Sequence, residues 1–200
     1  VLLLSPAELL KQSRDAKRIT EVHNIDLAVS SFLSDKPGVR VGGDNVIYIS
    51  VADPAAPVNT TTTCPNMGLP MPPTGWAYQC SNQTDLQKVN GKGWLPLDLT
   101  AISFGAPISV LPIDPTNTVA SGFYYAYAAN RREYAITAPL ESAKRLKAAA
   151  IPDGGTDFTR YERGNNIAVA TQASGLVGYW KLDDGAGTTA SDATGNGNVG

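Results

Sequence analysis

The feature that most constrains this chain is an uninterrupted helix-forming stretch at its start, from Val1 to Leu33. From Ala7 onward the stretch contains no Gly and no Pro. It is rich in Ala, Leu, Lys, Arg and Glu, which lose little side-chain freedom in a helix. Ser5 followed by Pro6 is typical of an N-cap and a first helical residue. At 1.5 Å per residue the stretch predicts a helix of roughly 45–50 Å, which is long for a protein of this size.

The predicted helix has two different faces. Apolar residues recur at helical spacing in its C-terminal half and predict a face that packs on the rest of the protein: Ile19, Val22, Ile25 or Asp26, Val29, Phe32 and Leu33. The opposite face is expected to carry charged residues: Lys11, Arg14, Arg18 and Glu21. Asp15 and Arg18 are spaced to form an i,i+3 ion pair, and Glu141 and Arg145 to form an exposed i,i+4 pair.

Strand signals follow the helix. β-branched and aromatic residues predict a strand over Val46–Val51 and a shorter one over Gly75–Cys80. The clearest β signal is a hairpin whose arms are Phe123–Ala128 and Glu133–Ala138. The segment 52–74, rich in Pro and Thr, predicts no regular element. The expected fold class is α+β, a long N-terminal helix packed on a small antiparallel sheet with a further β segment at the C-terminus.

The chain has two cysteines, Cys64 and Cys80, in a loop-like region rich in Thr, Pro and Gly. An even pair that brackets a short loop predicts a disulfide and hence an extracytoplasmic compartment. Closing such a loop would stabilise the fold by roughly 3 kcal/mol in the chain-entropy model. A zinc site is the alternative use of two cysteines, but it needs more ligands, and the single histidine, His23, lies far away in sequence.

Composition and motifs argue against two classes of function. A net charge of −2 argues against nucleic-acid binding, because nucleic-acid-binding proteins usually carry a basic excess. The sequence contains no nucleophile elbow, no phosphate-binding glycine loop and no zinc-protease motif, and a single histidine offers no evident catalytic base. We therefore expect a protein that is not an enzyme, without cofactor and without a nucleic-acid partner.

Over about residues 1–170 the chain resembles type IV pilins and major pseudopilins. The resemblance rests on the long helix that starts inside an apolar run, with RDAKR followed by ITEVHNIDLAVSSFLSD. It rests also on GWLPLDLTAISFGAPISVLPIDPTN, in which an LP-x-DP motif precedes the hairpin segment GFYYAYAANRREYAITAPLES. The family's processing site and N-terminal aromatic residue are absent upstream, so the chain is expected to be truncated there.

The resemblance implies a structural subunit of an extracellular, cell-surface filament, anchored in the inner membrane before it assembles with copies of itself. In that family the first helix forms the filament core. The apolar residues expected in the core are Leu2, Leu3, Leu4, Leu9 and Leu10, with Pro6 at the position of a helix-breaking proline, and the residues expected to set register are Lys11, Arg14 and Arg18. The resemblance also raises a calcium site at Asp153 and Asp157, for which two carboxylates are too few to commit a metal.

The C-terminal segment has a different composition, rich in Gly, Asp, Asn and Thr. From Ser174 it resembles the first strand and loop of a laminin-G-like or concanavalin-like jelly roll, with GLVGYWKLDD followed by GNGN. The expected organisation is a helix over 1–33, a pilin-like head over 34–172 and the start of a β domain or tail over 173–200. An alternative function follows, that of a surface adhesin whose pilin-like stalk displays a glycan-binding jelly roll.

Overall fold

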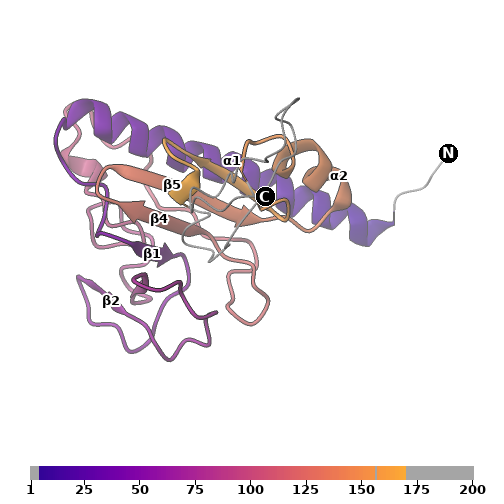
Figure 1. Ribbon diagram of the computed structural model, residues 1–200, viewed down its shortest axis with the longest axis horizontal. Helices are drawn as coiled ribbons and strands as arrows, with labels where there is room; N and C mark the ends of the chain where they lie inside the picture. Colours follow the sequence, from indigo (N-terminus) through magenta and orange to yellow (C-terminus); the bar gives the residue numbers. More distant parts are fainter. Residues whose placement is uncertain (1–4, 156, 170–200) are drawn as a thin grey trace, which may run out of the picture.

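A computed structural model describes residues 5–155 and 157–169. It has one long helix and one sheet, in the arrangement shown in Figure 1. Helix α1 spans Pro6–Asp35, and a short helix α2, Ala143–Arg145, continues into the π-helical turn η2, Leu146–Ala150. A 3₁₀ turn, η1, spans Leu99–Ala101. The strands are β1 Val46–Ile49, β2 Thr61–Thr63, β3 Ala77–Ser81, β4 Ala126–Asn130, β5 Glu133–Pro139 and β6 Arg160–Gly164.

Helix α1 begins and ends where local chemistry allows. Ser5 is the N-cap, and its hydroxyl oxygen accepts a hydrogen bond from the backbone N–H of Glu8 at 3.3 Å. Pro6 occupies the first helical position, where its missing N–H costs nothing. At the other end the N–H of Lys36 donates to the carbonyl of Phe32, and Pro37 follows. The predicted helix is confirmed, with its end two residues later than Leu33.

The strands form a six-stranded sheet in the order β2-β3-β1-β4-β5-β6. All neighbours are antiparallel except β1 and β3, which run parallel, with Ile47 opposite Tyr78. The α+β fold class, the predicted strands near Val46 and Ala77 and the predicted hairpin are confirmed. The expectation of a small sheet is wrong, because β2 and β6 extend it at both edges, and β2 lies inside the Pro/Thr-rich segment.

Helix α1 covers one face of the sheet. Its buried apolar residues Val22, Ile25, Ala28, Val29 and Phe32 pack on the aromatic side chains that β1, β4 and β5 turn toward it, among them Tyr48, Tyr127 and Tyr134. The rings of Tyr127 and Tyr134 stack with centroids 5.7 Å apart. Burial of each such side chain contributes about 1.5–3 kcal/mol, so this layer stabilises the protein substantially.

The other face of the sheet carries a second, smaller apolar cluster around Ile47, Ile49 and Tyr124. The disulfide between Cys64 and Cys80 belongs to this cluster, and its sulfurs are 2.09 Å apart. It joins the segment that follows β2 to strand β3. The predicted disulfide is confirmed.

Two further expectations concern residues beyond those described. Leu2, Leu3 and Leu4 precede the described part of the chain, and the jelly-roll-like segment from Ser174 follows it. Within residues 5–155 and 157–169, no helix combines the length and the apolar character needed to cross a bilayer.

Candidate functional site: the N-terminal half of helix α1

The N-terminal end of α1 extends beyond the sheet, at the right of Figure 1. None of its residues from Pro6 to Ser13 is buried, and the first buried residue of the helix is Asp15. Leu9 is 52% and Leu10 61% exposed, although both are large apolar side chains. We call residues 6–13 the overhang. It is a helix end on which two apolar side chains are more than half exposed.

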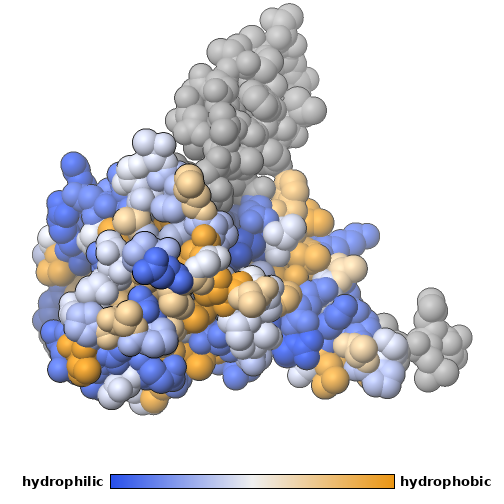
Figure 2. Space-filling view, turned by 90° about the horizontal axis from the view of Figure 1, so that it is seen from below, coloured by the Kyte–Doolittle hydropathy of each residue, from blue (hydrophilic) through white to orange (hydrophobic). Residues whose placement is uncertain are grey.

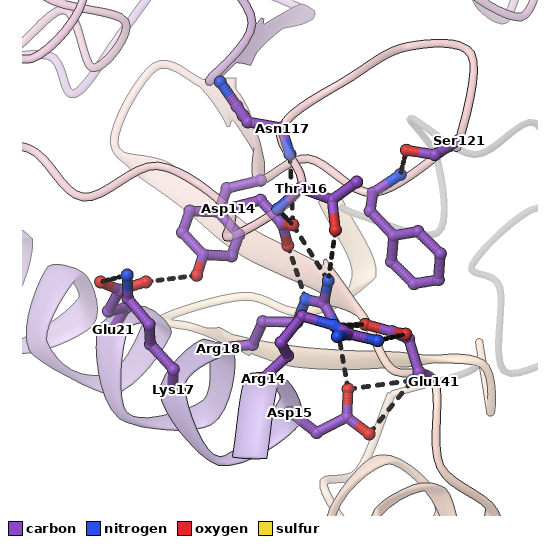
Figure 3. Close-up of polar contacts among 12 residues, drawn as sticks. Arg14, Asp15, Lys17, Arg18, Glu21, Asp114, Thr116, Asn117, Ser121 and Glu141 are labelled. Carbon is purple, nitrogen blue, oxygen red and sulfur yellow. Dashed lines mark hydrogen bonds and ion pairs between the residues drawn. The ribbon is translucent and has the colours of Figure 1, made fainter. Parts of the chain in front are cut away.

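Arg18 lies near the point where the overhang meets the body of the protein. Its side chain is fully buried, and its guanidinium lies at the centre of the contacts drawn in Figure 3. Nε and Nη2 donate to the two carboxylate oxygens of Asp114 at 2.6 and 3.0 Å. Nη1 donates to Asp15 at 2.9 Å and to Glu141 at 2.5 Å. Nη2 also approaches the hydroxyl of Thr116 at 3.5 Å, so every nitrogen of the group has an oxygen partner.

The partners of Arg18 come from three separate segments of the chain. Asp15 lies one turn earlier on α1, Asp114 lies in the LPIDP loop, and Glu141 follows strand β5. Asp15 in turn accepts hydrogen bonds from the backbone N–H groups of Glu141 and Ser142. The guanidinium also lies 4.6 Å from the centre of the Phe123 ring. We call Asp15, Arg18, Asp114 and Glu141 the Arg18 cluster; it ties the helix to a loop and to a strand end.

Arg14 completes the cluster at its solvent edge. Arg14 pairs with the carboxylate of Glu141: its Nε donates to Oε1 at 2.7 Å and its Nη2 to Oε2 at 2.5 Å. Two guanidinium groups therefore share Glu141, whose side chain is only 10% exposed, whereas that of Arg14 is 35% exposed. Directly after the overhang, α1 is thus held to the residues that follow β5 by a bidentate ion pair.

The ionisation of the cluster follows from its contacts. Hydrogen bonds from Arg14, together with those from Arg18, lower the pKa of Glu141 to about 2. Partial burial of the carboxylate acts in the opposite direction but is outweighed. Burial by itself would lower the pKa of Arg18, but its hydrogen bonds to Asp114, Glu141 and Asp15 outweigh burial and raise it. Arg18 and Glu141 therefore stay charged at neutral pH.

A second polar contact lies one turn further along α1. The hydroxyl of Tyr125 donates to Glu21 at 2.5 Å, and Lys17 lies 3.7 Å from the same carboxylate. Burial raises the pKa of Glu21 despite these contacts, and it raises the pKa of Tyr125 strongly, with the hydrogen bond to Glu21 adding to the effect. Glu21 is thus half-buried against the sheet, where the sequence indicated an outward-facing residue.

The structure corrects two of the sequence-based placements. The prediction that Arg18 lies on the face opposite the packed apolar face is wrong, because the cluster buries it completely; its i,i+3 pair with Asp15 is confirmed. The predicted pair of Glu141 and Arg145 is also wrong, because Glu141 reaches back across the fold to Arg14 and Arg18. The remaining predicted assembly residues, Pro6, Leu9, Leu10 and Lys11, are exposed on the overhang.

Asp153 and Asp157, which by themselves are too few carboxylates to commit a calcium site, lie in the loop that precedes β6. Asp153 accepts hydrogen bonds from the backbone N–H groups of Gly155 and Glu162, both at 2.8 Å. Asp157 accepts from the backbone and the hydroxyl of Thr159. Among the described residues no group of three or more His, Cys, Asp or Glu side chains is placed to hold a metal ion. The hydrogen bonds that Asp153 and Asp157 accept order the loop.

The sequence alone does not assign Asp114 and Glu141 to a site. The LPIDP motif stands out only as part of a family pattern, and the spacing of Glu141 suggests a pair with a neighbour on its own segment. One signal was present: Arg18 lies four residues before Val22, on the same stripe that continues through Ile25 and Val29. A cation on the buried stripe needs buried carboxylate partners, and an aspartate in an apolar LPIDP loop is a suitable candidate.

Comparisons with models of protein families, with curated proteins and with solved structures find no match to this chain. The exposed helix end held by a buried arginine is the observation from which a function can be inferred.

Proposed function

We propose that this chain is a structural subunit of an extracellular filament of the type IV pilus or pseudopilus kind, assembled by packing of the α1 helices of many copies. The observation that carries the proposal is the division of α1 at Arg18. Residues Val22 to Phe32 supply the buried stripe of the subunit, whereas none of residues 6–13 is buried.

The overhang has an energetic reason to find a partner. Removing a leucine side chain from water is favourable by about 1.5–3 kcal/mol when burial is complete. Leu9 and Leu10 are both more than half exposed in the single subunit. A contact between the overhang of one copy and a different surface of the next is heterologous, and such contacts repeat into open helical assemblies when they do not close into a ring.

The Arg18 cluster gives the overhang a defined direction. Because the guanidinium is bonded to a loop through Asp114 and to a strand end through Glu141, α1 is held to the head immediately below the overhang. A filament needs the same contact geometry in every copy. A helix end held by a buried bidentate pair keeps one orientation, whereas a helix end on a hinge would not. In this account Arg18 acts inside the subunit, Arg14 is held by Glu141 at the edge of the cluster, and Lys11 is exposed at the surface.

The disulfide supports the proposed location. Disulfides form and persist in oxidising environments such as the cell surface and are rare in the cytosol. The bond between Cys64 and Cys80 thus favours a subunit that works outside the cytoplasm.

The test is electron microscopy of material sheared from cells that make the protein, with an antibody against the head. The proposal predicts regular filaments that the antibody labels along their whole length. Label confined to membranes, with no filaments among the sheared material, would contradict it.

A further inference from the structure

A groove lies on the face of the sheet opposite α1. It consists of two adjoining hollows of about 210 and 510 Å³, which share Pro70, Met71 and Tyr78. Ala126 and Ala128 of β4 line the first hollow, and their small side chains leave the sheet surface low there. Pro70 and Met71 lie in the loop that the disulfide closes, so one side of the groove is joined covalently to β3.

Hydrophobic and hydrophilic side chains are mixed on this side of the molecule. Strand β2 and the segments around it lie at the bottom of Figure 1, and Figure 2 views the protein from there. In that view hydrophobic residues, in orange, lie among hydrophilic residues, in blue. Such a surface suits a ligand that has both an apolar face and polar groups.

Two tyrosine hydroxyls in the groove have no protein partner. Tyr78 and Tyr124 line the first hollow, and neither hydroxyl forms a hydrogen bond within the described part of the chain. Burial raises the pKa of Tyr78 to about 12 and also raises that of Tyr124, so both hydroxyls keep their protons at neutral pH and can donate. The buried tyrosines of the helix-side core differ, because each has a hydrogen-bond partner: Tyr48, Tyr125, Tyr127 and Tyr134.

Arg160 brings a cation to the same hollow. Its Nε donates at 2.9 Å to the hydroxyl of Thr137, a side chain that is only 7% exposed, and this bond fixes the direction of the guanidinium. Among residues 5–155 and 157–169 Arg160 forms no ion pair, and its Nη groups have no hydrogen-bond partner. The guanidinium can therefore bind a ligand in the groove.

Two carboxylates complete the first hollow. Asp157 and Glu162 line it together with Arg160, and Glu162 is only 2% exposed. These carboxylates would repel a compact dianion such as phosphate. They are suitable acceptors for the hydroxyl groups of a ligand. Arg160, in contrast, matches a single carboxylate, which a guanidinium can bind through two parallel hydrogen bonds.

These groups together match a saccharide better than an apolar peptide. A saccharide ring has an apolar face of C–H groups, which packs on aromatic side chains, and a rim of hydroxyls, which donate and accept hydrogen bonds. An apolar peptide would leave Arg160 and the two tyrosine hydroxyls without partners when it covered them. Trp76 lines the second hollow and provides an aromatic surface for a neighbouring ring.

We propose that the groove binds an oligosaccharide that contains an acidic sugar. The carboxylate of that sugar accepts hydrogen bonds from Arg160 and from the hydroxyls of Tyr78 and Tyr124, while a ring hydroxyl donates to Asp157. The next sugar packs on Trp76. This inference goes beyond the proposed function and does not depend on it, because the groove belongs to a single copy of the chain.

The test is binding of the purified 200-residue chain to immobilised oligosaccharides that contain uronic or sialic acids, each beside its neutral counterpart. The wild type is expected to bind acidic oligosaccharides and not their neutral counterparts. Titration calorimetry with an acidic oligosaccharide that binds then compares variants. Arg160→Gln should weaken binding about tenfold or more, because hydrogen bonds between charged groups are lost. Tyr78→Phe, which keeps the shape of the groove, should weaken it several-fold.

The matched control is Arg163→Gln, which removes the same charge from the same strand. The side chain of Arg163 lies on the helix side, with its Nε 3.5 Å from Asp26, so this variant should bind as the wild type does. Thermal melting followed by circular dichroism separates loss of the groove from loss of the fold. The inference would be overturned if the wild type bound no acidic oligosaccharide or bound neutral counterparts equally well. Equal losses in Arg160→Gln and Arg163→Gln would also overturn it.

Discussion

At the scale of single residues, Arg18 is the side chain on which the arrangement depends most. Its guanidinium has no exposed surface, and it faces three carboxylates, of which Asp15 and Asp114 are also buried. A buried charge is tolerated only with well-placed partners, and removal of one partner leaves the others uncompensated. The cluster therefore fixes which loop and which strand end α1 can contact.

Replacement of Arg18 by a side chain of similar length without charge tests this role. Arg18→Met is expected to lower the free energy of unfolding by about 3–5 kcal/mol, because it leaves buried carboxylates without their cation. Denaturant unfolding followed by circular dichroism measures the change. The neighbouring Lys17→Met is the control: its side chain is 56% exposed, so its loss should cost less than about 1 kcal/mol. Similar losses in the two variants would contradict a special role for Arg18.

The same cluster predicts how stability depends on pH. Because the pKa of Glu141 falls from its ordinary 4.5 to about 2 on folding, its contribution to stability is fully present above 4.5. That contribution is lost as the pH falls through about 2. Glu141→Gln removes the titrating group, so the variant should be less stable at neutral pH and show a flatter loss of stability between pH 4.5 and pH 2.

Urea unfolding at a series of pH values compares these curves. Glu133→Gln serves as the reference, since Glu133 is an exposed residue at the start of β5. This variant should retain the steep decline of the wild type. A Glu141→Gln curve as steep as that of the wild type would show that the carboxylate is not stabilised by folding.

Among the elements, the bounds of helix α1 can be predicted from the sequence, but the carboxylates that pair with its Arg18 cannot. The absence of Gly and Pro and the Ser5-Pro6 start determine the helix within two residues. Its apolar periodicity correctly identified Val22, Val29 and Phe32 as core residues. Arg18 falls on that same stripe, but charge alone suggested solvent. Only the tertiary structure, which brings Asp114 and Glu141 from distant segments, explains why a charge is stable there.

The sheet shows a similar limit. β-branched and aromatic runs predicted β1, β3 and the β4–β5 hairpin, because these strands pair and pack through their own side chains. Strands β2 and β6 have a weaker signal, since Thr61–Thr63 is a short β-branched run without apolar residues inside a Pro-rich segment, and three of the five residues of Arg160–Gly164 are charged. Their pairing depends on the neighbouring strand, and β2 is additionally joined to β3 through the nearby disulfide. Edge strands of this kind are specified by tertiary context.

At the scale of the whole molecule, α1 has two parts with different partners. The part from Val22 onward packs on the tyrosines of the sheet, and the overhang from Pro6 to Ser13 leaves the head with its leucines exposed. The Arg18 cluster lies between them. The first part accounts for the packing of the helix on the sheet, and the second is the surface that we propose joins copies of the chain.

We propose that the overhang joins subunits without contributing to the fold of any one of them. The filament yield of cells that make Leu10→Asp, compared by electron microscopy with that of cells that make Leu27→Asp, tests this division of α1. Both leucines lie on α1 and both are more than half exposed, but Leu27 belongs to the part that packs on the head. We predict that Leu10→Asp loses filaments while its purified head melts as the wild type does, and that Leu27→Asp keeps them. Normal filaments from Leu10→Asp, or equal loss from both variants, would contradict the account.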